Sequence, residues 1–388
     1  MTALKLTAEP ESSPPSDLSF SERLETINQM QEDYDASCVR VTKQIQENAL
    51  KEAEGRETED QSNGKEVVDT APASTMQRDP PIARSEGLEI GVYTNATHHA
   101  DGLFSTVYKA TSQDLPDLVA LKVTIPSAMT APHDSRREIR LLHQAASEHV
   151  IRLLDSFRHA GDHLVLVFPF MPLDLEVLLA SRANHKPTLL NIRKHLRDLF
   201  SALEYIHSVG LIHRDVKPSN LLLRGPNGPA YLADFGIAWS PNDPASEPAE
   251  RKITDVGTTS YRPPELLFGN EAYDSSLDLW AAGCVVAEAS RLSDKTLFDS
   301  GDLGSELALI QSIFKSLGTP TLDVWPQAAE FRDWGKMTFY PFPPQPWSQL
   351  LPDSPAEAQD LVSKLVRYES GERLTAREAL THPFLDLE

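Results

Sequence analysis

Cysteine is scarce in this sequence, with two residues among 388. So few cysteines exclude a disulfide scaffold, and the wide separation of Cys38 and Cys284 excludes the spacing of paired metal ligands. We therefore expect a protein of the cytoplasm, the nucleus or both.

A long hydrophobic run is also missing. The most apolar stretch, 277–292, contains Asp278 and Glu288 and is too short to cross a bilayer, so we expect no membrane association.

Acidic residues outnumber basic residues in this sequence. The chain has 36 Lys and Arg against 57 Asp and Glu, which gives a formal net charge of −21. Proteins that bind nucleic acids gain affinity by neutralising phosphates with clustered basic residues, so this balance argues against nucleic acid as a partner. Any phosphate that the protein handles is expected to bind at a local site.

The composition changes near residue 86. Residues 1–86 hold 9 Lys and Arg against 18 Asp and Glu, with Pro and Ser concentrated at 10–16. Such a segment buries too little apolar surface to offset the entropy of folding, so we expect an acidic and mostly disordered extension. Apolar residues nevertheless recur every seven positions within it, at Phe20, Ile27, Tyr34 and Val41. This pattern predicts an amphipathic helix across 19–53, which either docks or dimerises weakly or forms only transiently.

The remaining residues, 87–388, show two kinds of pattern in succession. Runs of β-branched and aromatic residues at strand length come first, at 92–110, 118–125 and 163–170, with one helical pattern between them at 134–146. Further helical patterns follow at 189–209, 275–291, 305–317, 355–367 and 375–381. We therefore expect an α+β fold, with a small β-rich lobe that contains one helix (87–170) and a larger α-helical lobe (171–388). A ligand cleft between two lobes is the default expectation.

Four short motifs occur in a fixed order. They are VALK at 119–122, HRDVKPSN at 213–220, DFG at 234–236 and PPE at 263–265. In this order and at this spacing they make residues 87–388 resemble the eukaryotic protein kinases. The resemblance implies a bilobal protein kinase fold and transfer of the γ-phosphate of ATP to protein substrates.

Phosphoryl transfer explains why these residue types are needed, because the protein mainly positions the transferred group and stabilises its charge. By the resemblance, Asp234 and Asn220 supply oxygen ligands for Mg²⁺. Asp215 orients the substrate hydroxyl and accepts its proton, while Lys217 reaches the transferring phosphate.

A lysine–glutamate ion pair belongs to the same arrangement. The resemblance implies that Lys122 holds the α- and β-phosphates of ATP and that an acid on the following helix fixes this lysine in place. Glu138 has the better context for that role, in the run REIRLL, although Glu148 is another acid nearby.

The glycine-rich loop of the family is reduced in this sequence. Its pattern G-x-G-x-x-G-x-V falls on Ala100, Gly102, Ser105 and Val107, so only the middle glycine remains. Glycines in this loop allow backbone N–H groups to approach phosphates closely. We expect weaker or slower nucleotide handling rather than none, with His99 beside the loop as a further nucleotide contact.

The resemblance also assigns contacts to the adenine base. Val107 and Ala120 lie above the base, Leu222 lies below it, and Phe168 guards the back of the pocket. Met171 offers a backbone N–H from the segment that joins the lobes. The same apolar residues are expected to be part of the core.

The downstream motifs resemble one branch of the family. They are YRPPELLFG at 261–269, SLDLWAAGCVVAE at 276–288, LGTP at 317–320, VWP at 324–326 and ERLTAREALTHPF at 372–384. Together they are similar to the cyclin-dependent kinases. By this resemblance Asp278 holds the HRD turn, and Glu265 pairs with Arg373 to anchor the activation segment.

Two features of cyclin-dependent regulation are altered. The helix that a cyclin grips reads APHDSRREI rather than a PSTAIRE-like run, so whether this protein binds a cyclin stays open. The inhibitory Thr-Tyr pair of the glycine-rich loop falls on Leu103 and Phe104, and phenylalanine has no hydroxyl group to phosphorylate.

The activation segment departs from the branch as well. Its activating threonine falls on Ile253. The three arginines that cradle the phosphate of that threonine fall on Arg137, Arg214 and Trp239. We therefore expect this segment to be ordered by packing or by the neighbouring Thr254.

Residues near the end of the activation segment bear on substrate choice. Thr258 is expected to hydrogen-bond near Asp215 and not to act as a switch. Arg262 matches an arginine that, in this group, binds a turned-away backbone carbonyl and favours proline after the phosphoacceptor. Gly257 reaches the positive φ of such a turn without steric cost, and the same freedom is expected to loosen the preference for proline.

These departures make the sequence most similar to the monomeric, cyclin-independent CDK-activating kinases of fungi. We interpret it as an ATP-dependent serine/threonine kinase whose protein substrates include other cyclin-dependent kinases. Three alternatives stay open: a cyclin-bound kinase in cell-cycle or transcription control, another kinase of the same group, and a pseudokinase that binds nucleotide or a partner without catalysis. The reduced glycine-rich loop motivates the pseudokinase, whereas intact Lys122, Asp215, Asn220 and Asp234 argue against it.

Overall fold

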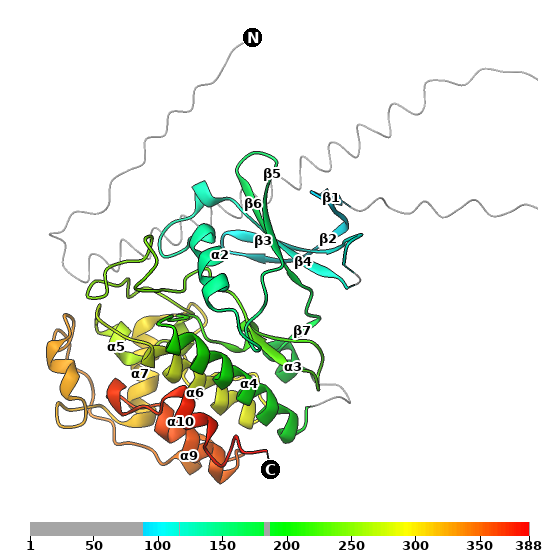
Figure 1. The fold of residues 1–388 in the computed structure, drawn as a ribbon. Coiled ribbons are helices and arrows are strands. Elements are labelled where there is room, and N and C mark those ends of the chain that lie inside the picture. Colours follow the sequence, from blue (N-terminus) through cyan, green and yellow to red (C-terminus); the bar gives the residue numbers. More distant parts are fainter. Residues whose placement is uncertain (1–87, 116, 182–186, 388) are drawn as a thin grey trace, which may run out of the picture. The chain divides into compact units, whose positions relative to one another are not determined.

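The structure is a computed structural model, and it describes residues 88–115, 117–181 and 187–387 (Figure 1). All of them belong to one unit of the chain, Ala83–Glu388. The amphipathic helix predicted at 19–53 lies outside the described residues. Figure 1 shows the larger sheet gathered in one lobe and most of the helices in the other. This is the two-lobed α+β arrangement that the sequence predicts.

The first lobe is built on one antiparallel sheet with the strand order β1-β2-β3-β4-β6-β5. Its strands are β1 (Leu88–Ile90), β2 (Tyr93–Gly102), β3 (Ser105–Thr111), β4 (Val119–Thr124), β5 (Asp155–His159) and β6 (His163–Pro169). Successive side chains of a strand point to opposite faces, so β4 buries Val119 and Leu121 on one face and presents Ala120 and Lys122 on the other. The register of β3 with β4 places Val107 opposite Lys122.

One α-helix, α2 (Ser135–Gln144), completes this lobe after a short 3₁₀ turn at Pro126–Ala128. It begins after Asp134, whose carboxylate accepts hydrogen bonds from the backbone N–H groups two and three residues further on, at 2.8 and 3.0 Å. This cap satisfies donors that the first turn of a helix leaves free. Glu138 shares the buried face of α2 with Leu141 and Leu142, because residues three and four apart lie on the same side of a helix.

The second lobe is mainly helical. Its helices are α3 (Leu175–Ala180), α4 (Leu189–Ser208), α5 (Pro264–Leu267), α6 (Ser276–Ser290), α7 (Glu306–Leu317), α8 (Trp347–Leu350), α9 (Ala356–Leu365) and α10 (Ala376–Leu380). α4 packs against α6 and α10, and α6 packs against α9. A small antiparallel sheet of β7 (Leu173–Asp174), β8 (Leu221–Leu223) and β9 (Ala230–Leu232) borders α4. The helical patterns of the sequence correspond to α4, α6, α7, α9 and α10, whereas they do not predict α3 or the small sheet.

Helix α6 contains the most apolar stretch of the sequence. Its residues from Leu277 to Ser290 are all buried, so protein surrounds the helix on every side. Two acids are buried with it, Asp278 near its beginning and Glu288 near its end. Within the part of the chain that the structure describes, no helix has both the length and the apolar character needed to span a membrane.

Candidate active site

Three charged side chains meet between the two lobes. Lys122 of β4 places its Nζ 2.7 and 3.0 Å from the carboxylate oxygens of Glu138 on α2, and 2.8 Å from Oδ1 of Asp234. The side chain of Glu138 is 2% exposed, that of Lys122 is 16% exposed and that of Asp234 is 48% exposed. The triad is therefore enclosed on the side of α2 and open on the side of Asp234.

The charges of this triad change one another's ionisation. The positive charge of Lys122 lowers the pKa of Asp234 far below its usual range, although burial opposes the shift. Burial disfavours the charged form of Lys122, but the negative charges of Asp234 and Glu138 outweigh that effect and raise the pKa of the lysine. Lys122 is thus protonated and Asp234 ionised at neutral pH, which are the charge states that bind phosphate and a cation.

Asp215 of the HRD motif lies in a second network. Its Oδ1 accepts hydrogen bonds from the backbone N–H and from the hydroxyl group of Thr258, both at 2.9 Å. Its Oδ2 accepts from Nδ2 of Asn220 at 3.0 Å and lies 3.0 Å from Nζ of Lys217. Lys217 also donates to the hydroxyl of Thr258 at 2.8 Å. Thr258 thus hydrogen-bonds to Asp215, as the sequence predicts.

Asn220 is oriented by the same network. Its Nδ2 donates to the backbone oxygen of Asp215 at 2.8 Å as well as to the carboxylate, so the amide oxygen is the atom left for a cation. The N–H of Ala233 donates to the backbone oxygen of Asn220 at 2.9 Å, which brings the following residue, Asp234, near. Together Asn220 and Asp234 offer few but hard oxygen ligands, a set that fits a divalent cation completed by phosphates and water. The described residues include no group of three or more His, Cys, Asp or Glu side chains that could hold a metal ion alone.

Two residues of this site have left-handed backbone conformations, with φ of 72° at Arg214 and 65° at Asp234. Such conformations cost a non-glycine residue free energy and persist only where neighbours hold them. Asp278 holds the first, because its carboxylate accepts the backbone N–H groups of His213 and Arg214, both at 2.9 Å. The same carboxylate lies 2.9 Å from Nε2 of His207. The predicted role of Asp278 in holding the HRD turn is confirmed.

The residues assigned to the adenine base come from β3, β4, β6 and β8 and from the segment that joins the lobes. Ala120, Phe168, Met171 and Leu222 all belong to or pack against the main hydrophobic cluster. The register of β4 with β6 places Ala120 opposite Phe168. Ala120 shares a face of β4 with Lys122, and Val107 lies opposite that lysine. Val107, Ala120 and Phe168 therefore lie on the strands around Lys122, and Met171 and Leu222 are partly buried against the same cluster as Ala120.

The reduced glycine-rich loop is a hairpin between β2 and β3. Gly102 pairs with Ser105, so Leu103 and Phe104 form its tip, and Ala100 lies on β2 next to an irregularity in the pairing. The Phe104 ring contacts His133, just before α2, with 4.8 Å between ring centroids. His99 packs edge-on against Phe170, at 5.0 Å, in the segment that joins the lobes. The hairpin is thus attached both to the start of α2 and to the linker.

Comparison with known families decides what kind of protein carries this site. The profile of the protein kinase domain matches residues 93–385, a range that includes every site residue described above. The chain belongs to the protein kinase family.

Three relatives narrow the type of kinase. Serine/threonine-protein kinase csk1 of Schizosaccharomyces pombe is 36% identical over 290 residues, which cover 74% of this chain and 92% of that protein. Cyclin-dependent kinase D-1 of Arabidopsis thaliana is 36% identical over 286 residues, covering 73% and 68% of the two chains. Cyclin-dependent kinase 20 of Danio rerio is 34% identical over 289 residues, covering 73% and 80%. The kinase is therefore an ATP-dependent serine/threonine kinase of the cyclin-dependent kinase type.

The end of the activation segment of the kinase has the expected turn. Gly257 has φ of 74°, and its carbonyl accepts a hydrogen bond from Nε of Arg262 at 3.0 Å. Arg373 donates to both carboxylate oxygens of Glu265, at 2.6 and 2.7 Å, and both side chains are buried. The predicted Glu265–Arg373 pair is confirmed.

The middle of the segment is anchored by packing. Ile253, at the position of the usual activating threonine, packs against a small cluster that includes Trp239 and Tyr273. Its backbone oxygen accepts a hydrogen bond from the Tyr273 hydroxyl at 2.7 Å. From the sequence we expect this segment to be ordered by packing or by Thr254. The structure shows packing at Ile253, the residue before Thr254.

Sequence reasoning missed an acid in the activation segment of the kinase. Glu247 places its carboxylate 3.2 Å from Nη1 of Arg214 and 3.9 Å from Nη1 of Arg137. A signal was present in the sequence, since the two arginines lack their usual phosphothreonine while acids at 243, 247, 250 and 255 lie between DFG and PPE. Spacing alone does not say which of these acids meets the arginines.

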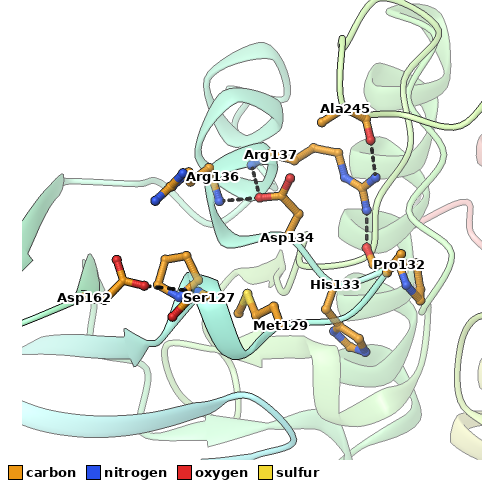
Figure 2. Close-up of a pocket in the computed structure, with 11 residues that line it drawn as sticks. Ser127, Met129, Pro132, His133, Asp134, Arg136, Arg137, Asp162 and Ala245 are labelled. Atoms are coloured by element: carbon orange, nitrogen blue, oxygen red, sulfur yellow. Dashed lines mark hydrogen bonds between the residues drawn. The ribbon is translucent and has the colours of Figure 1, made fainter. Parts of the chain in front are cut away.

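A cavity of about 470 Å³ lies at the beginning of α2 and not at the ATP motifs (Figure 2). Its lining includes Met129, His133, Asp134 and Arg136. Figure 2 shows the guanidinium group of Arg137 between the backbone carbonyls of Pro132 and Ala245, which accept its hydrogen bonds. The nucleotide assignment therefore rests on the motif residues and not on this cavity, which borders the activation segment.

Proposed function

We propose that this kinase transfers the γ-phosphate of ATP, bound with Mg²⁺, to serine or threonine residues of other cyclin-dependent kinases, and that it does so without a cyclin. The observation that carries the proposal is the assembled triad of Lys122, Glu138 and Asp234. In this triad α2 is held in place by contacts within the kinase itself. The N–H of Asp134 at the start of α2 donates to the backbone oxygen of Gly236 in the DFG motif at 3.2 Å. The departures from the PSTAIRE-like run and from the usual activating threonine support the same proposal.

The geometry supports an ordinary phosphoryl transfer. The substrate hydroxyl oxygen forms a bond to the γ-phosphorus, the bond between that phosphorus and the ADP oxygen breaks, and the hydroxyl proton passes to Asp215. Asn220 and Thr258 keep the Asp215 carboxylate in one orientation, and Lys217 supplies positive charge 3.0 Å from it. Lys122, fixed by Glu138, binds the α- and β-phosphates. Asp234 and Asn220 would hold Mg²⁺ through their side-chain oxygens, and that ion would supply positive charge for the nucleotide phosphates.

The Gly257–Arg262 turn supports a preference for proline after the phosphorylated residue. A carbonyl turned toward Arg262 is no longer available to accept a substrate N–H, and proline is the residue that has no such N–H to leave unsatisfied. A library of peptides with Ser, Thr or Tyr at the centre and varied residues after it measures both preferences. We expect phosphorylation of Ser and Thr with proline enriched at the next position, whereas dominant tyrosine phosphorylation contradicts the proposal.

The natural substrate class is tested with the full chain, ATP and Mg²⁺. The acceptors are a catalytically inactive cyclin-dependent kinase and a generic basic protein, each with and without added cyclin. We expect transfer to the inactive kinase, on its activation segment, that cyclin does not increase by more than about twofold. Activity that appears only with cyclin favours the cyclin-bound alternative. If neither acceptor is phosphorylated, the result favours the pseudokinase.

A further inference from the structure

The carboxylate of Glu247 lies beside Arg214 and Arg137, the two arginines that, by the resemblance to cyclin-dependent kinases, cradle the phosphate of the activating threonine. Arg214 donates to it from Nη1 at 3.2 and 3.4 Å and from Nη2 at 3.3 Å, and Nη1 of Arg137 lies 3.9 Å away. The backbone oxygen of Glu247 accepts a hydrogen bond from Nε1 of Trp239 at 2.9 Å. Glu247 therefore contacts all three residues that occupy the positions of the usual arginine cradle.

The buried guanidinium groups of Arg214 and Arg137 need the negative charge of Glu247. The side chain of Arg214 is fully buried and that of Arg137 is 3% exposed, while Glu247 is 15% exposed. Two buried guanidinium groups without an anion are strongly unfavourable, because neither water nor an opposite charge compensates them. Burial by itself raises the pKa of Glu247, but the positive charges of Arg214 and Arg137 outweigh it and hold that pKa below its usual value. Glu247 is therefore an anion at neutral pH.

The two arginines are neighbours of the catalytic acids. Arg137 precedes Glu138 on α2, and Arg214 precedes Asp215 in the HRD turn, where its φ of 72° leaves little freedom. Arg137 also donates to the backbone oxygens of Pro132 and Ala245, which ties the start of α2 to the activation segment (Figure 2). One carboxylate thus connects α2, the HRD turn and the segment that carries it.

A second ion pair strengthens the same connection. Arg140, one turn further along α2, donates to both carboxylate oxygens of Asp243 at 2.6 and 2.9 Å. Asp243 is only 4% exposed and also accepts the backbone N–H of Ala245 at 2.9 Å, so its position is well defined. The residues between 243 and 247 are therefore fixed against α2 at both ends.

We propose that Glu247 replaces the activating phosphate of this kinase: its carboxylate, hydrogen-bonded by Arg214 and 3.9 Å from Arg137, positions α2 and the HRD turn so that the catalytic groups are assembled without phosphorylation of the segment. Glu247 is a positioning residue, because it acts through the two arginines and does not touch the reacting atoms. The inference rests on the proposed protein kinase activity but not on which protein is the natural substrate.

The first test compares unphosphorylated full-length variants on a generic basic protein. Glu247→Gln keeps the size of the side chain and removes its charge, and Glu247→Asp keeps the charge but shortens the reach. We expect kcat to fall by about tenfold or more in Glu247→Gln, with KM for ATP changed less than about threefold, and an intermediate loss in Glu247→Asp. Glu250→Gln, an exposed acid on the same segment, is the matched control and keeps wild-type kcat.

The second test is chemical rescue. Glu247→Ala leaves room for an anion beside two guanidinium groups whose Nε atoms are buried without a hydrogen-bond partner among the described residues. A phosphate ion has more acceptor oxygens and more charge than a carboxylate, so it suits this cradle. We expect millimolar sodium phosphate to raise the kcat of Glu247→Ala by about fivefold or more, relative to sodium chloride at equal ionic strength, and to leave the wild type unchanged.

Several results overturn the inference. A kcat of Glu247→Gln within about twofold of the wild type shows that the charge is not needed. Wild-type activity that is lost after phosphatase treatment, or that depends on phosphorylated Thr254, shows that a phosphate and not Glu247 positions α2 and the HRD turn. If Glu247→Gln is unstable, Glu247→Asp and the phosphate rescue decide the question, and a Glu247→Ala protein that phosphate does not restore contradicts the proposal. Failure to phosphorylate cyclin-dependent kinases contradicts only the proposed function, because these assays use the generic acceptor.

Discussion

Lys122 and Asp215 act through charge at fixed positions rather than through core volume. Lys122→Met and Asp215→Asn should therefore each lower kcat by several orders of magnitude, roughly 10²–10⁴-fold, while the kinase stays folded. Steady-state kinetics on a basic protein measures the loss, and thermal unfolding checks the fold. Asp353→Asn, at an exposed position, is the control. Activity of both catalytic variants within about tenfold of the wild type contradicts the active-kinase interpretation.

Glu288 shows how burial of a single carboxyl group sets a pH dependence. Burial raises its pKa to about 8, against an ordinary value of 4.5, and it accepts a hydrogen bond from the Tyr261 hydroxyl at 3.1 Å. Between these two values the folded kinase keeps a proton that the unfolded chain releases. The stability contributed by this group is thus complete below about pH 4.5 and is lost as the pH rises through about 8.

Glu288→Gln removes this pH dependence, because glutamine keeps the hydrogen-bond acceptor and does not ionise. We expect the difference in the free energy of unfolding, variant minus wild type, to increase by roughly 1–3 kcal/mol from about pH 6 to about pH 8. Denaturant unfolding at both pH values measures the difference. Glu330→Gln, an exposed acid, should show no such change, and an equal pH response of wild type and Glu288→Gln contradicts the assignment.

At the scale of an element, the end of the activation segment depends on the conformation of one glycine. Gly257→Ala adds a methyl group that overlaps the backbone oxygen of Arg214, so it should displace the HRD turn and lower kcat. Gly335→Ala is the control, because Gly335 has a similar φ of 78° and no atom within 4 Å of the added carbon. Both variants should lose about 1–2 kcal/mol of stability from the left-handed backbone, but only Gly257→Ala should lose activity. Equal kinetics of the two variants contradicts the coupling of this turn to Asp215.

At the scale of the whole molecule, the acidic extension is separate from the kinase domain in sequence. Deletion of residues 1–80 should leave a soluble kinase whose kcat is within about threefold of the full chain, because the matched domain begins at residue 93 and the first described strand at Leu88. Circular dichroism, gel filtration and the basic-protein assay test this. An insoluble or inactive truncated protein shows that the boundary near residue 86 is wrong.

Local patterns determined much of what this protein is. The order of VALK, HRD, DFG and PPE identifies the family because each motif is a short run whose chemistry is visible without the rest of the chain. Helices such as α4 and α9 were predictable because periodic burial repeats over several turns. The strands β7 to β9 were not, since two or three residues are too few to show a period.

Only the tertiary structure decided which distant charges meet. Arg214 and Glu247 are 33 residues apart, and Arg137 belongs to a different lobe from Glu247, so no sequence window contains the cluster. The same holds for Glu288, whose unusual pKa comes from the protein packed around α6 and not from its neighbours in sequence. The sequence by itself determined the chemistry of the reaction, because that chemistry requires particular residue types in short motifs. The folded chain decided which acid meets the two arginines, because burial and distance exist only once the segments are brought together.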